Sequence, residues 1–124
     1  MFGQKIDQKV RFLLPNFEEF AVYKIATFVN LDGVDRVLSE MFESGGGRIG
    51  NYDSCCFISK GIGQFRPLKG SNPALGEHGV LTKVEEARIE MVVEDKYIKE
   101  VIAALKRAHP YETPAYEVFR LEDL

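Results

Sequence analysis

The sequence of 124 residues lacks tryptophan, and it has only two cysteines and two histidines. The cysteines, Cys55 and Cys56, are adjacent. Neighbouring residues on a strand point to opposite faces, so this pair can neither form an ordinary disulfide nor readily bind one zinc ion together. Free cysteines are among the most buried residues. We therefore expect one buried cysteine and one partly exposed thiol.

Long apolar runs are also missing. No stretch approaches the roughly 20 apolar residues that a membrane-spanning helix needs. The N-terminal stretch has a short apolar patch that Pro15 interrupts, and Glu18 and Glu19 follow where a signal peptide would have small residues. We therefore expect a cytoplasmic protein that does not contact a membrane.

Neither sign of charge dominates the sequence. It has 16 lysines and arginines against 19 acidic residues, a net charge of −3, and the two signs are interspersed without a basic run. This pattern argues against a nucleic-acid partner. The length and the 45% of hydrophobic residues are those of one ordinary globular domain.

What the sequence does contain is a strand–helix–strand pattern. The β-branched and aromatic segment Val22–Val29 predicts a strand, and Asp32 follows it as a candidate helix N-cap. Glycines Gly45–Gly47 end the predicted helix, and a second strand is expected from about Tyr52 to Ser59. The helix itself is indicated by apolar residues that recur on one helical face: Val34, Val37, Leu38, Met41 and Phe42.

The same pattern returns 64 residues later, where Val29 corresponds to Val93 and Tyr52 to Tyr116. The second unit comprises a strand Glu86–Val93, the cap Asp95, a helix Lys96–Ala108 and a strand Ala115–Leu121. Two such units predict an α+β ferredoxin-like βαββαβ plait, with a four-stranded antiparallel sheet and both helices on one face.

The plait accounts for residues 22–124 and leaves residues 1–21 as an N-terminal extension. The uncovered face of its sheet carries Tyr23 or Ile25, and Val92 or Met91, depending on the strand register. An apolar face without helices favours self-association.

A glycine-rich loop, residues 61–79, joins the second and third strands. Loops longer than about 12–15 residues are uncommon and are usually functional or disordered. In one hypothesis the loop binds an anion, such as a nucleotide phosphate, or a protein partner, through Gly61, Gly63, Arg66 and Lys69. In the alternative, three apolar side chains dock the loop onto the domain: Phe65, Pro67 and Leu75. We expect the middle of the loop, residues 64–70, to lie at a subunit boundary, near the segment that begins at His109 of the same or an adjacent chain.

That segment, "HPYETP", supplies further candidates for a ligand site, namely His109, Tyr111 and Glu112. An imidazole beside a carboxylate suits a ligand or a proton carrier. His109 and Glu112, together with a cysteine, are also candidates for metal ligands. The alternative is that His109 caps the preceding helix. Tyr52, which corresponds to Tyr116 in the other unit, is a candidate for directing a hydroxyl into a cleft.

Four stretches of the sequence together resemble a known family: "GGGRIGNYDSCCF", "GIGQFRPLKGSNPALGEHG", "VEEARIEMVV" and "HPYETPAYEVFRLED". They are similar to the PII/CutA-like domain of the YqfO group, which is inserted in Nif-three family proteins, the GTP cyclohydrolase 1 type 2 homologues. The resemblance covers about Val22 to Leu124. It implies the PII/CutA type of plait, a homotrimer whose sheets pack around a central axis, and a loop equivalent to the one with which PII proteins sense nucleotides.

The resemblance does not extend to the metal-binding domains that flank this insert in the full-length family. Their metal ligands have no counterparts in this chain, so it does not imply metal-dependent hydrolysis here. The leading hypothesis is a non-enzymatic, trimeric PII-like binding or regulatory protein without a cofactor. Its small-molecule ligand is unknown, and anions and nucleotides are among the candidates. A CutA-like metal-binding protein, and an accessory subunit or remnant of a Nif-three type hydrolase, remain as alternatives.

Overall fold

The computed structural model of the chain describes residues 21–122, so the predicted N-terminal extension lies almost entirely outside the described residues. The strands are β1 (Val22–Asn30), β2 (Phe57–Phe65), β3 (Thr82–Glu94) and β4 (Tyr116–Leu121). The helices are α2 (Val34–Glu43) and α3 (Ile98–Ala108), preceded by the short 3-10 helices η2 (Leu31–Gly33) and η3 (Asp95–Tyr97). Among these helices, none is long and apolar enough to cross a membrane.

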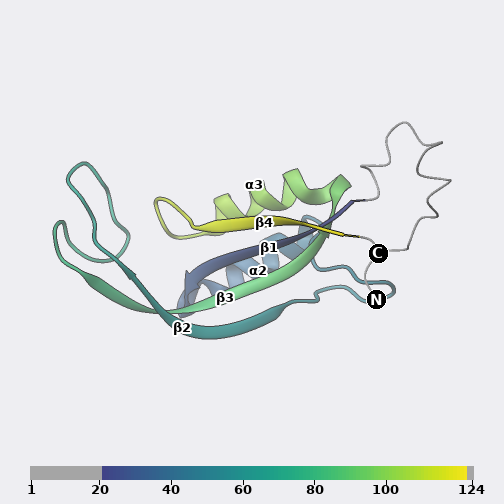
Figure 1. The fold of residues 1–124 in the computed structure, drawn as a ribbon, viewed down its shortest axis with the longest axis horizontal. Helices are drawn as coiled ribbons and strands as arrows, with labels where there is room; N and C mark the ends of the chain where they lie inside the picture. Colours follow the sequence, from purple (N-terminus) through teal and green to yellow (C-terminus); the bar gives the residue numbers. More distant parts are fainter. Residues whose placement is uncertain (1–20, 123–124) are drawn as a thin grey trace.

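The four strands form one antiparallel sheet in the order β2-β3-β1-β4, and both helices lie on the same side of it (Figure 1). This arrangement confirms the predicted ferredoxin-like plait. The core lies between the sheet and the helices, where it contains Ile25, Val29, Ile89, Met91 and Val93 from the sheet and Val37, Met41, Val101 and Leu105 from the helices. Shortening one of these side chains, as in Leu105→Ala, is expected to cost about 2–5 kcal/mol.

The strand register decides which residues the open face of the sheet carries. Ile25 pairs with Met91, and both belong to the core, so they lie on the helix side. Lys24 pairs with Val92, which places Val92 on the opposite, open face. That face is more polar than expected, because Arg88 lies 3.0 Å from Glu90 and 3.5 Å from Glu117.

The two helices begin differently from the prediction. Asp32 and Asp95 do not cap them: they lie inside η2 and η3, and neither α-helix has a side-chain N-cap hydrogen bond. The predicted glycine stop is confirmed. Gly45 has a φ of +111° and donates to the carbonyl of Phe42, and the next amide donates to that of Met41, which together form a Schellman motif.

The internal repeat breaks down between α2 and β2. The backbone of Gly47 bonds to Val92 and Cys55, and Ile49 pairs with Tyr52 in a short bridge, so the chain turns on itself before β2 starts at Phe57. Tyr52 is therefore in a turn and 75% exposed, whereas Tyr116 begins β4 and packs against the core. The predicted equivalence of these two tyrosines is wrong.

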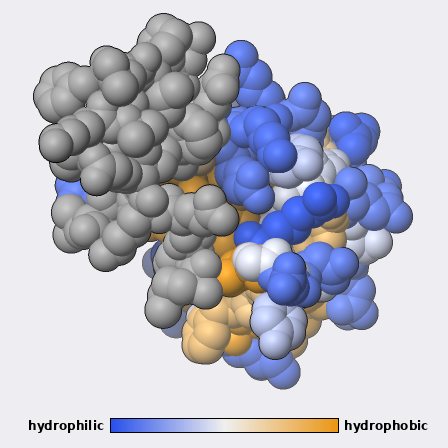
Figure 2. Space-filling model, turned by 90° about the vertical axis from the view of Figure 1, so that its right-hand side faces the viewer, coloured by the Kyte–Doolittle hydropathy of each residue, from blue (hydrophilic) through white to orange (hydrophobic). Residues whose placement is uncertain are grey.

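The cysteines lie in and just after this turn. Cys55 is half-exposed and Cys56 is exposed, so the expectation of one buried cysteine is also wrong. At the end of the molecule away from the long loop, hydrophilic residues make up most of the visible surface around a smaller hydrophobic area (Figure 2).

Candidate functional site

The long loop begins later than the sequence predicted. Strands β2 and β3 continue as a paired hairpin through Gly63↔Val84 to Phe65↔Thr82, beyond the rest of the sheet (Figure 1). Gly61 and Gly63 are therefore strand residues and do not belong to the loop that was expected to bind an anion. The connection between the strands is confined to residues 66–81.

This loop is ordered by its own contacts. The amide of Gly79 donates to the carbonyl of Pro67 at 2.7 Å, and the His78 ring lies within hydrogen-bond distance of the Ser71 carbonyl at 2.7 Å. Pro67 is buried. Together with Phe65 and Leu75, the other apolar side chains of the docking hypothesis, it lines a pocket under the loop.

The loop folds back onto the segment that joins α3 to β4, as expected. The amide of Asn72 donates to Oε1 of Glu112 at 2.9 Å. That segment is fixed to the end of β1 at two points: His109 bonds to the Phe28 carbonyl at 2.8 Å, and Thr27 Oγ1 donates to the Ala115 carbonyl at 2.8 Å. The contacts join parts of the same chain.

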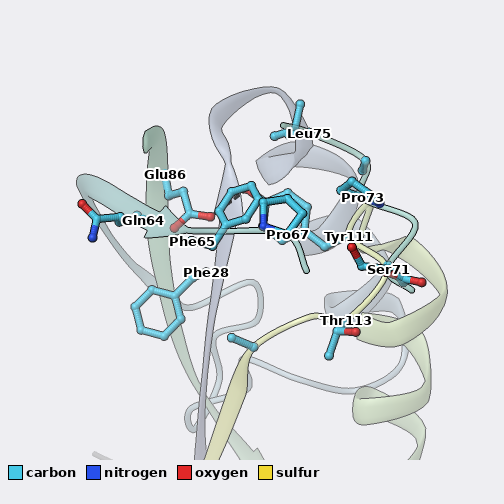
Figure 3. Close-up of a pocket in the computed structure, with 14 residues that line it drawn as sticks. Phe28, Gln64, Phe65, Pro67, Ser71, Pro73, Leu75, Glu86, Tyr111 and Thr113 are labelled. Atoms are coloured by element: carbon cyan, nitrogen blue, oxygen red, sulfur yellow. Dashed lines mark hydrogen bonds between the residues drawn. The ribbon is translucent and has the colours of Figure 1, made fainter. Parts of the chain in front are cut away.

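Between the loop, the hairpin and this segment lies a pocket with a volume of about 380 Å³ (Figure 3). Its walls are largely apolar, and its polar groups include two carboxylates and a phenol. The lining consists of Phe28, Gly63, Gln64, Phe65, Pro67, Ser71, Pro73, Ala74, Leu75, Glu86, Tyr111, Glu112, Thr113 and Ala115.

Tyr111 and Glu86 of β3 both line the pocket and are hydrogen-bonded to each other. The Tyr111 Oη donates to Oε2 of Glu86 at 2.7 Å. Burial, the hydrogen bond to Glu86 and the negative charge of Glu86 all raise the pKa of Tyr111, against a smaller opposite effect of the Asn30 backbone. The phenol therefore keeps its proton and acts as a donor. Gly63 makes room for this pair, because a Cβ at that position would overlap the Glu86 carboxylate.

His109 lies behind this pair and is buried. Its Nδ1 accepts from the Tyr111 amide at 3.2 Å, so the proton is on Nε2, which donates to the Phe28 carbonyl. Burial lowers the pKa of His109, although the Phe28 carbonyl and the charge of Glu86 act in the opposite direction. The ring is thus a neutral structural link to β1. His109 also caps α3, as the alternative hypothesis had it, but through its backbone amide, which donates to the Leu105 carbonyl at 2.9 Å.

Both nitrogens of His109 are engaged within the chain, which argues against the ring as a metal ligand. Within residues 21–122, no group of three or more histidine, cysteine, aspartate or glutamate side chains could hold a metal ion.

The structure brings together only part of the predicted site. Gly63, Tyr111 and Glu112 line the pocket. Arg66 and Lys69 are exposed and do not belong to its lining. A Cβ added at Gly61 would meet only open space. His109 lies beside the pocket, in contact with Tyr111, and Tyr52 lies before the start of β2, at the end of that strand away from the pocket.

Sequence reasoning missed the central carboxylate, Glu86, and the aromatic wall formed by Phe28. One signal could have found Glu86. A glycine inside a strand, here Gly63, often marks a place where another group approaches the backbone closely.

No family model matches this chain. It is 41% identical over 112 residues to a protein of Halalkalibacterium halodurans named GTP cyclohydrolase 1 type 2 homolog, and the match covers 90% of this chain and 30% of that protein. A protein of the same name from Mycobacterium leprae is 35% identical over 123 residues, which is 98% of this chain and 31% of the relative. The chain thus spans under a third of the length of these relatives.

Solved structures show the same relationship. A Bacillus cereus protein related to NIF3 superimposes with a TM-score of 0.71 and 37% identity, over 82% of this chain and 26% of that protein. The divalent cation tolerance protein CutA of Archaeoglobus fulgidus shares the fold, with a TM-score of 0.57 and 16% identity over 82% of this chain and 84% of CutA. The GlnK–ATP complex of Bacillus subtilis also shares it, with a TM-score of 0.54 and 13% identity over 82% of this chain and 84% of GlnK. The chain is therefore homologous to a segment of the Nif-three-related proteins named GTP cyclohydrolase 1 type 2 homologues, and its fold is the PII/CutA form of the ferredoxin-like plait.

Proposed function

We propose that this chain is a non-enzymatic, PII-like binding domain that takes up a small molecule in the pocket under residues 66–81. The observation that carries the proposal is the pocket itself, with a volume of about 380 Å³. Small-molecule sites are concave, largely apolar and furnished with a few fixed polar groups, and this pocket has all three properties.

The way the loop is held favours regulation by binding. Its link to the α3–β4 segment, the bond from the Asn72 amide to Glu112, is exposed. Such a bond to a carboxylate contributes about 1.5–3 kcal/mol, so breaking it to open the loop costs only a small part of the stability of a domain. A ligand that contacts both sides of the pocket would hold the loop closed and thereby change the surface that it offers to a partner.

The state of the titratable groups supports binding over catalysis. His109 is neutral, with both ring nitrogens bonded inside the chain, and Tyr111 holds its proton against Glu86. A general acid or base works best with a pKa near the operating pH, and the shifts of both groups lead away from that range.

We further propose that the domain forms a homotrimer through the open face of its sheet. Phe57 and Phe119 lie on that face, as their pairing with Glu90 and Lys24 shows, and they are 65% and 46% exposed. Removing two large aromatic side chains from water would favour association.

A screen of cationic, neutral and anionic fragments by ligand-observed NMR tests the binding function. Ala74→Trp would fill the pocket, whereas Ala103→Trp adds the same side chain at an exposed position of α3. We expect fragments that bind to the parent protein and to Ala103→Trp but not to Ala74→Trp. If no fragment binds, or if Ala74→Trp binds them equally well, the pocket is not a binding site.

A further inference from the structure

We propose that the pocket selects a small organic cation, an amine or amidine joined to an apolar body, with the Glu86 carboxylate as its charge partner. The proposal rests on the proposed binding function and adds the chemical class of the ligand. It also departs from the anion that the sequence suggested.

The charged side chains of the pocket lining all have the same sign. Two carboxylates, Glu86 and Glu112, line the pocket, and among the described residues no lysine, arginine or histidine does so. Arg66 and Lys69 lie outside the lining, and Arg88 is paired with Glu90 and Glu117 on the sheet. A concave site with charges of one sign attracts ligands of the opposite sign and disfavours ligands of the same sign.

The Glu86 carboxylate is held with one oxygen available to a ligand. The bond from Tyr111 to Oε2 fixes the carboxylate, and the described residues donate no hydrogen bond to Oε1. Oε1 lies over Gly63, another lining residue, and Figure 3 shows the side chain directed toward Phe65. A carboxylate only accepts hydrogen bonds, and its bonds to charged donors are about twice as strong as neutral ones. An ammonium or amidinium group is the complementary donor.

The remaining wall of the pocket is aromatic and aliphatic. Phe65 supplies an aromatic face. Phe28, whose ring already has the Arg88 guanidinium 5.2 Å from its centre, adds apolar surface, as do Pro67, Pro73 and Leu75. Aromatic rings bind the apolar body of a ligand and also attract a cation within about 6 Å of their centres. The ligand should therefore carry its positive charge next to an apolar group.

A bare metal ion fits the site less well. Hard divalent cations such as Ca²⁺ take about six to eight oxygen ligands, whereas the lining contributes two carboxylates. Within residues 21–122, no cluster of three or more ligating side chains includes this pair.

Three probes with one apolar body test the inference: phenethylamine, 2-phenylethanol and 3-phenylpropionate, titrated by NMR into the full chain at pH 7.5. We expect phenethylamine to bind about 10-fold or more tightly than the alcohol, because a charge-assisted bond is stronger than a neutral one, and 3-phenylpropionate to bind most weakly. Glu86→Gln keeps an acceptor for Tyr111 but loses the charge, so it should abolish the preference for the amine and leave the affinity for the alcohol unchanged.

Glu85→Gln is the matched control, because Glu85 is the neighbouring exposed residue of β3 and does not line the pocket. It should behave like the parent protein, as should the Arg66→Ala, Lys69→Ala double variant. The inference is overturned if the acid binds best, if the three probes bind equally or not at all, if Glu85→Gln loses the preference as Glu86→Gln does, or if Ca²⁺ alone displaces the amine. These outcomes differ from a failure of the proposed binding function. In that case the screen would find no fragment, of any charge, whose binding Ala74→Trp prevents.

Discussion

Tyr111 and Glu86 join two parts of the chain that are 25 residues apart, through a 2.7 Å hydrogen bond from the phenol to the carboxylate. Tyr111 belongs to the α3–β4 segment and Glu86 to β3, so the bond ties the segment to the hairpin that carries the long loop. The neighbouring ring of His109, 4.7 Å from that of Tyr111 between centroids, extends the link to β1. The wall of the pocket is therefore a connected unit whose parts can be tested one by one.

The first prediction concerns alkaline pH. The pKa of Tyr111 is raised in the folded protein, so the unfolded chain loses this proton first. The contribution to stability is complete below the ordinary tyrosine pKa of about 10 and is lost as the pH rises above it. Urea unfolding from pH 8 to 11 should show this loss, and it should be smaller in Tyr111→Phe. Tyr52→Phe, at an exposed position, is the control; equal pH slopes for the parent and Tyr111→Phe would refute the prediction.

The second prediction concerns His109. Burial lowers its pKa in the folded protein, so below the ordinary histidine pKa of about 6.5 the unfolded chain takes up a proton first. The contribution of His109 to stability is thus complete above about pH 6.5 and is lost as the pH falls below it. The chain has two histidines, so an NMR titration gives two imidazole signals, and His78→Gln identifies the one that remains as His109. A His109 signal that titrates at or above the ordinary value would contradict the burial described here.

The helices were the part of the fold best predicted from the sequence. Apolar spacing alone located α2, because a helix buries one face, and the shift of 64 residues then located α3. The repeat failed only where residues 48–55 form a turn of their own, with positive φ values at Gly50 and Ser54. Non-glycine residues rarely adopt such values, so nothing in the apolar pattern around Ser54 announces that turn.

The site was harder to predict for a physical reason. Tyr111 and Glu112 were identified because an unusual proline-bounded segment drew attention to them. Glu86 was not identified, because its role depends on tertiary structure. The strand register sets it opposite Gly61, and the Tyr111 phenol donates a hydrogen bond to it from a distant part of the sequence. Arg66 and Lys69 looked suited to an anion, but the fold of the loop leaves both outside the pocket lining.

The third prediction uses the two glycines of β2 as a matched pair. Gly63→Ala should displace the Glu86 carboxylate, weaken its bond to Tyr111 and lower the free energy of unfolding by about 1–3 kcal/mol. At Gly61 an added Cβ meets nothing within 4 Å. Gly61→Ala should therefore be neutral or stabilising by about 0.5–1 kcal/mol, because alanine loses less entropy in a strand. Urea unfolding measures both; a larger loss for Gly61→Ala would show that Gly63 does not accommodate Glu86.

The fourth prediction concerns assembly. Light scattering at micromolar concentration should give about three times the 14.0 kDa mass of the chain. Phe119→Glu should dissociate the trimer, because it places a charge on the open face of the sheet, whereas Leu68→Glu on the exposed loop should not. A monomer for the parent protein, or dissociation by Leu68→Glu alone, would contradict association through this face.

The most direct test of the binding function is a two-dimensional NMR titration of the ¹⁵N-labelled full chain with the tightest-binding fragment from the screen. We predict that the largest amide shifts fall on Gly63, Asn72, Glu86 and residues 111–113, at the pocket and at the bond that holds the loop closed. The amides of Tyr52, in the turn before β2, and of Cys56, just after that turn, should not move. Shifts concentrated in that turn or on the outer face of the helices, with none at the pocket, would contradict the account.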